Sequence, residues 1–222
     1  MSTDQPVAKG EARERILDTA EELFAHQGVD AVSLRQINAA AGVSPGVLHY
    51  HFGSREVLVH ELINRHMATL MGQREQRLLV LDEQAQPRLQ DIIAALVMPL
   101  AELALAEGES GPRYVRFISR MYSDRSPVLE EISERYRDIN GLYPKLLRRA
   151  LPQMAPAELD LRFAMANHAM LQLLSELKGP PRSWLGQALE QVDKPQLIAI
   201  LIDFMCSGVS GSDTKQSEEP ST

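Results

Sequence analysis

The feature that most constrains this fold is a pair of very short helices, each bounded by its own sequence signals. Ser33 and Gln36 form a capping box, in which the serine hydroxyl accepts from a backbone amide and the glutamine side chain reaches back. Gly42 ends that helix, Ser44 begins the next one with a proline at the first helical position, and Gly53 ends it. The two short helices and the three-residue turn between them form a helix-turn-helix arrangement.

The rest of the sequence is also helical in its periodicity. Apolar residues recur at i, i+3 and i+4 between Gly, Pro and Ser residues, whereas the strict alternation of a strand is hard to find. We expect an all-α chain with about nine helices, in which Pro99 kinks the fifth and Gly141 and Pro144 interrupt the seventh. The expected ranges are 12–27, 33–41, 44–52, 55–81, 89–107, 113–123, 127–150, 157–178 and 195–206.

The composition is that of a folded protein with polar ends. The chain has 222 residues, of which 44% are hydrophobic and 24% are charged, so it can bury a core. We expect residues 1–10 to form a flexible arm and residues 207–222 a disordered tail, because neither segment has much to bury.

Nothing in the sequence indicates secretion or a membrane. The N-terminus has no apolar signal-peptide core, and the longest apolar run, residues 92–101, is far shorter than the roughly 20 residues that span a bilayer. The single cysteine, Cys206, excludes an intramolecular disulfide. We expect a cytoplasmic protein with no membrane partner.

The last helix is expected to be covered by a second copy of the chain. Residues 197–205 are apolar apart from Asp203, and only the polar tail follows them. Such a helix must be covered on most sides. A second subunit is the expected cover, and burial within the monomer is the alternative.

The charge of one stretch differs from that of the rest. The whole chain carries a formal charge of -7, which argues against nucleic acid because phosphate contacts need Lys and Arg. Residues 31–55, however, contain no Asp or Glu and carry a charge of +2. The same stretch holds three helix starts, at Ser33, Ser44 and Ser54, and helix N-termini bind phosphate. Together with two short helices in a helix-turn-helix arrangement, these features indicate a DNA-facing surface.

Two segments carry a family resemblance. ILDTAEELFAHQG begins at residue 16, and SLRQINAAAGVSPGVLHYHFGSREVLVHEL begins at residue 33 and holds the pattern G-V-S-x-G-x-L-x-x-H-F. From Arg13 to Glu61 the chain closely resembles the DNA-binding domain of bacterial TetR-family transcriptional regulators. The resemblance implies an N-terminal three-helix helix-turn-helix DNA-binding domain at 11–55 and a C-terminal helical ligand-binding and dimerisation domain at 56–206.

The resemblance also implies a function. The chain is expected to be a sequence-specific DNA-binding regulator, a repressor that a small hydrophobic effector releases from a pseudo-palindromic operator. Its homodimer would form through the helices at about 157–178 and 195–206 and would place two recognition helices in successive major grooves of double-stranded DNA. For the C-terminal half, a small-molecule-binding or adaptor module whose ligand is not an inducer is the alternative.

On the recognition helix, the resemblance assigns DNA contacts to Ser44, Pro45, Gly46 and Val47. Gly46 would permit close approach of the backbone, while Pro45 and Val47 favour apolar contact with thymine methyls. Tyr50 would contact a base or the DNA backbone. By their spacing, the core residues here are Leu34, Ile37, Val43, Leu48 and Phe52.

Five further residues are assigned chiefly to phosphates. Ser33, Arg35 and Gln36 on the first short helix would touch phosphates or a flanking base. Arg55 stands where the family usually has a phosphate-binding Lys, and His49 stands where it usually has a Tyr. The charge of the His49 contact would therefore depend on pH.

The C-terminal half has the composition of an adaptable apolar site. Eight of the nine Met residues lie between residues 67 and 205, and Met adapts to varied ligands, although scattered Met residues more often fill a core. From helical positions, we expect the effector to contact Met67, Leu70, Met71, Met98, Phe117, Met121, Tyr122, Tyr143, Met165 and His168. Arg113, Arg116 and Arg120 could hold an acidic head group or form ion pairs.

Two patterns typical of enzymes lack a required feature in this sequence. Residues 42–46 fit the G-x-S-x-G nucleophile elbow, but a helix rather than a strand precedes the serine, and Pro45 explains the pattern as helix capping. None of the six His residues follows an acid by three positions, as paired di-iron motifs require. We expect no catalytic residue, no cofactor and no metal.

Overall fold

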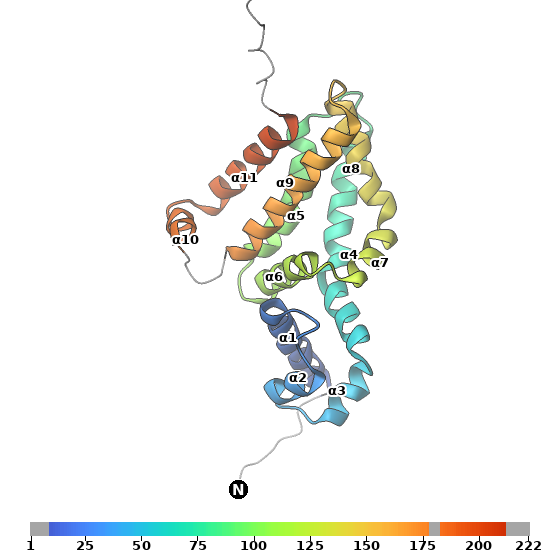
Figure 1. Ribbon diagram of the computed structural model, residues 1–222, viewed down its shortest axis with the longest axis vertical. Helices are drawn as coiled ribbons and strands as arrows, with labels where there is room; N and C mark the ends of the chain where they lie inside the picture. The colour runs from blue at the N-terminus through green and yellow to red at the C-terminus, as the bar shows by residue number, and fades with distance from the viewer. Residues whose placement is uncertain (1–8, 178–182, 212–222) are drawn as a thin grey trace, which may run out of the picture. The chain divides into compact units, whose positions relative to one another are not determined.

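The computed structural model describes residues 9–177 and 183–211, and every regular element in them is an α-helix (Figure 1). The helices are α1 (Lys9–Gln27), α2 (Leu34–Ala41), α3 (Pro45–Phe52), α4 (Arg55–Asp82), α5 (Leu89–Ala104), α6 (Ser110–Ser123), α7 (Pro127–Arg135), α8 (Arg137–Ala150), α9 (Pro156–Glu176), α10 (Ser183–Glu190) and α11 (Lys194–Ser210). The all-α expectation is confirmed, with eleven helices in the described ranges where about nine were expected.

The expected helix at 127–150 is two helices, and the predicted position of the break was wrong. Tyr136 has φ -106° and ψ 24°, and it separates α7 from α8. Gly141 and Pro144 both lie inside α8. A proline removes one backbone hydrogen bond from a helix, and burial of Leu146 and Leu147 on the same helix offsets that loss.

Parts of both expected polar ends are helical. α1 begins at Lys9, so the last two residues of the expected arm belong to a helix, and residues 1–8 lie outside the described residues. α11 continues to Ser210, because Val209 near its end is fully buried and holds the last turn in place. The expected tail at 207–222 thus starts as helix, and residues 212–222 lie outside the described part of the chain.

The chain divides into two compact units. The first contains residues 1–70 and 103–135, and the second contains residues 71–102 and 136–222. The helix-turn-helix segment shares the first unit with α6, α7 and the start of α4, so this division differs from a boundary at residue 55.

The core of the first unit forms around α1, which packs on α2, α3 and α6. Ile16, Ala20 and Phe24 of α1 are completely buried, and the ring of Phe24 stacks on that of Phe117 of α6, with centroids 6.2 Å apart. The tyrosine hydroxyl of Tyr114, also on α6, donates to the Ile63 carbonyl of α4 at 2.9 Å. These contacts give the short helices the support that they lack alone.

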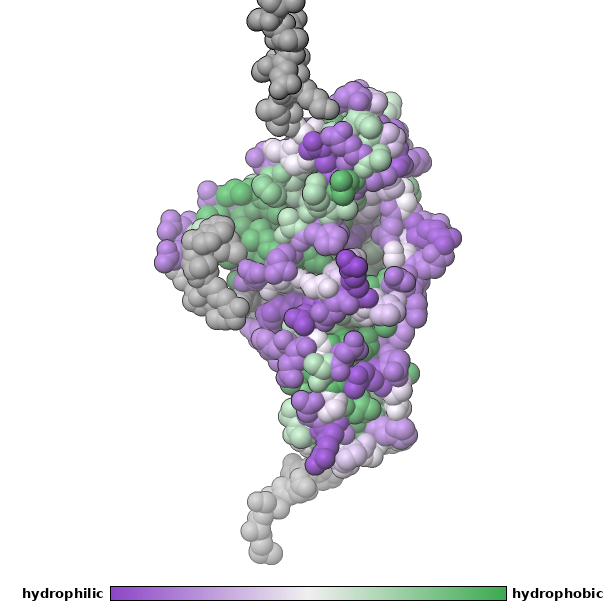
Figure 2. Space-filling view, viewed as in Figure 1, coloured by the Kyte–Doolittle hydropathy of each residue, from purple (hydrophilic) through white to green (hydrophobic). Residues whose placement is uncertain are grey.

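In the second unit, α9 and α11 lie side by side (Figure 1). Their inner faces bury Leu159, Ala166, Met170, Leu171 and Leu174 from α9 and Leu201, Met205 and Val209 from α11. Figure 2 shows that apolar side chains also gather on the outer surface over these helices. The exposed large apolar side chains of α9 and α11 are Leu161, Met165, Ile200 and Phe204, which are 51 to 62% exposed.

Candidate DNA-binding interface and effector region

The turn between α2 and α3 is fixed by backbone hydrogen bonds. Gly42 has φ +63°, a left-handed conformation that L side chains rarely adopt, and its amide donates to the carbonyl groups at the end of α2. The Val43 amide donates to the Asn38 carbonyl at 3.0 Å. Beneath this turn Ile37, Leu48 and Phe52 are buried. The helix-turn-helix predicted from the capping signals is present.

The predicted DNA-contact residues lie on the surface of this motif. Tyr50 of α3 is 68% exposed although it is a large aromatic residue. A Cβ built on Gly46 would meet nothing within 4 Å, so the backbone there is open to approach. The exposed members are Ser33, Arg35, Gln36, Ser44, Pro45, Gly46, His49 and Tyr50, and the half-buried ones are Val47 and Arg55. Their contacts with DNA stay predictions.

The three helix starts in this stretch differ in their capping. Ser33 and Gln36 form the predicted box, with the Gln36 amide donating to the serine hydroxyl oxygen at 3.2 Å. The Ser54 hydroxyl oxygen accepts from the Val57 amide at 3.3 Å at the start of α4. Ser44 makes no side-chain capping bond, which leaves its hydroxyl available at the start of α3.

The start of α4 also carries its own carboxylate. A hydrogen bond from Ser54 and one from the backbone lower the pKa of Glu56, and Arg55 lowers it further. A negative charge is favourable at a helix N-terminus, so this carboxylate competes with an incoming phosphate. Of the three starts, α3 is therefore the one whose amides are least satisfied by side chains.

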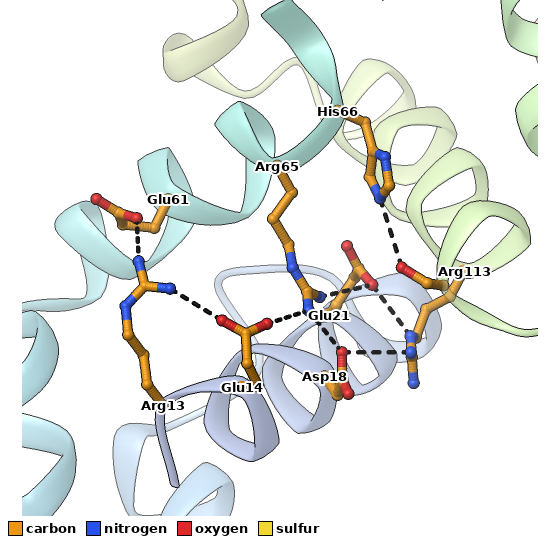
Figure 3. Close-up of polar contacts among 9 residues, drawn as sticks. Arg13, Glu14, Asp18, Glu21, Glu61, Arg65, His66 and Arg113 are labelled. Carbon is orange, nitrogen blue, oxygen red and sulfur yellow. Dashed lines mark hydrogen bonds and ion pairs between the residues drawn. The ribbon is translucent and has the colours of Figure 1, made fainter. Parts of the chain in front are cut away.

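A cluster of charged side chains joins α1, α4 and α6 within the first unit (Figure 3). Arg65 of α4 pairs with Glu14 at 2.8 Å, Asp18 at 2.9 Å and Glu21 at 3.5 Å. Arg113 of α6 pairs with Asp18 at 3.4 Å and Glu21 at 3.0 Å. Sequence reasoning missed this cluster, although the acids at 14, 18 and 21 have the spacing of one helical face.

Glu21 is the buried centre of that cluster, with no exposed surface. Burial raises the pKa of Glu21 to about 7, against the lowering influence of Arg65 and Arg113. One of its oxygens, Oε1, has no hydrogen-bond partner among the described residues. The carboxyl group therefore holds a proton more readily than an ordinary glutamate does.

The arginines that were candidates for an acidic head group pair with acids of the protein. Arg113 binds Asp18 and Glu21, Arg116 lies 3.8 Å from Glu22 and 3.7 Å from Glu109, and Arg120 lies 3.0 Å from Asp124. All are in the first unit. The ion-pair alternative is the one that the structure supports.

The residues predicted to contact the effector do not form one group within either unit. Met67, Leu70, Phe117, Met121 and Tyr122 belong to the first unit, and Met71, Met98, Tyr143, Met165 and His168 belong to the second. Leu70, Met71, Phe117, Met121 and Tyr143 are buried, and Met67 and Met98 are half-buried.

Three of these residues are exposed. Tyr122, Met165 and His168 lie at the surface, with Met165 57% exposed, and their contact with an effector stays a prediction. Helical position alone did not reveal which face of α6 or α9 turns inward.

One cavity in the second unit was not predicted at all. It lies between α5 and α11 and has a volume of about 490 Å³. Its walls are Leu89, Gln90, Pro195, Ile198, Ala199, Ile202, Asp203 and Cys206. A cavity of this size could hold a small molecule.

In the described ranges, no helix is long and apolar enough to cross a membrane.

Both parts of the chain match family models. Residues 16–62 match the model for bacterial regulatory proteins of the tetR family, and residues 94–208 match the model for the tetracyclin repressor-like C-terminal domain. The chain belongs to the TetR family. Members of this family are DNA-binding transcriptional regulators and not enzymes, so the resemblance of residues 13–61 and the exclusion of enzyme function are confirmed.

Individual TetR-family proteins show the extent of the likeness. The chain is 32% identical over 87 residues to the HTH-type transcriptional repressor KstR2 of Mycolicibacterium smegmatis, covering 39% of this chain and 41% of that repressor. It is 28% identical over 179 residues to the HTH-type transcriptional regulator BetI of Rhizobium meliloti, covering 77% of this chain and 81% of that protein. The chain thus matches less than half the length of the first of these.

A solved structure agrees with the fold. A TetR-like transcriptional regulator from Rhodococcus sp. RHA1 superposes with a TM-score of 0.61 at 17% identity, covering 93% of this chain and 100% of that chain. At this identity the likeness concerns the fold alone.

Proposed function

We propose that this TetR-family chain is a cytoplasmic homodimeric repressor that leaves a pseudo-palindromic operator when a small apolar effector binds. The observation that carries the proposal is the surface of α3. Tyr50, Pro45 and Gly46 are exposed above a buried core, in a stretch without acids inside a chain whose net charge is -7. DNA-binding repressors need such a local surface, because phosphate repels the acidic remainder.

The contacts that we propose follow from exposure and chemistry. Pro45, Val47 and Tyr50 on α3 face the bases in the major groove, where apolar groups contact thymine methyls. Ser44 at the uncapped start of α3 binds a phosphate with the helix amides. The other phosphate contacts are Ser33, Arg35, Gln36, His49 and Arg55.

The homodimer is supported by the apolar surface over α9 and α11. Leu161 and Met165 are spaced i, i+4 on α9, and Ile200 and Phe204 are spaced i, i+4 on α11, so each pair lies on one helical face. Exposed apolar patches of this kind mark interaction sites. A second copy covers them in our proposal, and two α3 helices then reach successive major grooves about 34 Å apart.

The role of repressor is supported by the relative named as a repressor, and the response to a ligand by the unexpected cavity in the second unit. α4 begins in the first unit and ends in the second, so the chain itself connects the two. An effector shifts DNA affinity only by its different affinity for two states, typically about 1 to 3 kcal/mol.

Selection from a random duplex library tests the proposal. Purified protein should enrich a two-fold symmetric sequence with half-sites about one helical turn apart. Enrichment of no sequence would contradict the repressor and favour an adaptor whose ligand is not an inducer. Screening small molecules for release of the enriched duplex then tests the response to an effector.

A further inference from the structure

Two hydrogen-bond donors in the second unit are buried without an acceptor. Tyr143 of α8 is only 3% exposed, and its hydroxyl has no hydrogen-bond partner among the described residues. Arg74 of α4 has a buried Nε that likewise has no partner there. Buried polar groups are nearly always hydrogen-bonded, so each orphaned group needs an explanation. The first unit holds four such groups, and the described residues of the second unit hold these two, both of which are donors that lack an acceptor.

Arg74 also has no counter-ion in the described part of the chain. Its Nη2 donates to the Leu96 carbonyl of α5 at 3.3 Å, and its Nη1 lies 3.9 Å from the Met71 sulfur. Other cations near the end of α4 are neutralised: Asp82 binds Lys145 at 2.7 Å and Arg149 at 2.8 Å. Partial burial of a guanidinium without a carboxylate partner costs free energy, unless an anion neutralises its charge.

The surroundings of the two donors are apolar. Met71 and Leu96, which contact Arg74, are 3% and 4% exposed. The ring of Phe163 of α9 stacks on the ring of Tyr143, with centroids 5.5 Å apart. Burial raises the pKa of Tyr143 to about 12, while the charge of Arg74 lowers it, so the hydroxyl keeps its proton at neutral pH. Both groups are thus hydrogen-bond donors with apolar neighbours.

We propose that Arg74 and Tyr143 form the polar end of the effector site, and that the effector is a carboxylate attached to an apolar body. This inference rests on the proposed function, because it names the ligand of a ligand-responsive repressor. A carboxylate supplies both missing acceptors and the missing charge, since it can accept from the guanidinium and from the phenol together. The apolar body would lie against the neighbours Met71, Leu96 and Phe163, none of which lines the cavity between α5 and α11.

A bound water is the competing explanation for the two orphaned donors. A water could accept from both groups, but it would leave the charge of Arg74 uncompensated. The two explanations differ in what they predict for a charged ligand. A carboxylate site prefers an acid to the alcohol of the same chain length, and a water site shows no such preference.

Isothermal titration calorimetry on the full chain tests the site. The probes are octanoate, dodecanoate and hexadecanoate, each paired with the alcohol of equal length and used below its micelle concentration. At least one acid should bind with one molecule per chain and about tenfold or more tighter than its alcohol. Binding of no acid, or equal binding of acid and alcohol, would overturn the proposal.

Variants then locate the binding. Arg74→Gln should weaken binding of the acid by about tenfold or more and leave binding of the alcohol unchanged. Tyr143→Phe should weaken binding of the acid several-fold. The controls are Arg77→Gln, on the same helix but exposed and 3.7 Å from Glu102, and Tyr136→Phe at the start of α8. Equal losses in the controls would contradict the assignment to Arg74 and Tyr143.

A mobility-shift assay with a library-selected duplex separates this inference from the proposed function. Release of DNA by the acid, lost in Arg74→Gln, supports both. Arg74-dependent binding without release supports the site and contradicts the proposed function. Release by the alcohol that is equal in Arg74→Gln supports the proposed function and overturns the carboxylate site.

Discussion

The Arg113 guanidinium donates to the buried carboxylate of Glu21 at 3.0 Å, although the two residues are 92 positions apart in the chain. Arg65 of α4 reaches the same carboxylate oxygen at 3.5 Å. One acidic side chain of α1 thus holds both α4 and α6 in the first unit. The helix-turn-helix motif packs on α1, so this carboxyl group takes part in positioning that motif.

Protonation of Glu21 makes stability depend on pH. Because the folded-state pKa is about 7 and the usual value is 4.5, the folded state binds more protons between these values. The protonated carboxyl group of Glu21 stabilises the folded state fully below about pH 4.5. Up to about 3 kcal/mol of this stabilisation is lost as the pH rises through 7. Urea unfolding of Glu21→Gln at pH 5 to 8 should show a flatter profile than the unmodified chain.

The exposed Glu11→Gln on the same helix is the control for this profile, and it should keep the original slope. The difference between the two variants isolates Glu21 from other groups, such as His66, whose pKa burial lowers. An unchanged slope in Glu21→Gln would contradict the raised pKa.

Substitution of Arg55 and of Val47, two proposed DNA contacts, should change DNA binding in different ways. Arg55→Ala should weaken binding to all duplexes alike and reduce the salt slope by about 1, because one phosphate contact is lost. Val47→Ala should instead change the preferred bases and leave the salt slope intact. Fluorescence anisotropy across a salt series, on selected and unrelated duplexes, measures both. Arg88→Ala, an exposed arginine of the second unit, is the control.

The left-handed turn at Gly42 should resist substitution for a conformational reason alone. A Cβ there meets nothing within 4 Å, so Gly42→Ala causes no steric clash with neighbouring residues. It should still lower the free energy of unfolding by about 1 to 2 kcal/mol, because alanine disfavours a φ of +63°. Gly141→Ala inside α8 also has open space and should instead stabilise, by about 0.5 to 1 kcal/mol. Urea midpoints of the two variants should therefore move in opposite directions; a fall for both would refute this account.

The apolar surface over α9 and α11 should control oligomeric state. Phe204→Glu places a charge on a side chain that is 60% exposed, so folding should survive while the dimer dissociates. Leu79→Glu on α4, with a side chain 50% exposed, is matched in exposure and should remain dimeric. Sedimentation velocity at micromolar concentration distinguishes the two. A Phe204→Glu protein that stayed dimeric would place the interface elsewhere.

Two buried tyrosines should respond oppositely to loss of the hydroxyl. Tyr114→Phe removes a bond of 2.9 Å to the Ile63 carbonyl and should destabilise by about 1 kcal/mol. Tyr143→Phe removes a hydroxyl that has no partner among the described residues, so the ligand-free protein should be equally stable or more stable. Thermal or urea unfolding without ligand measures both. A clear loss of stability in Tyr143→Phe would mean that the hydroxyl already has an acceptor.

Local signals were sufficient for the helix-turn-helix. Ser33, Gln36 and Gly42 specify one helix within a few residues, because capping bonds and a positive φ are local in the chain. Helical spacing also predicted the buried Ile37, Leu48 and Phe52. The break at Tyr136 had no such signal, and the prediction failed there.

The sequence by itself determined the all-α class, the two short helices with the turn between them and, through residues 13–61, the family. Only the tertiary structure decided which residues meet across long chain separations. It buried Glu21 between Arg65 and Arg113, turned Met165 outward, and left Arg74 without a counter-ion in the described residues. Helical periodicity determines which side chains share a face, but the packing of whole helices determines what that face contacts.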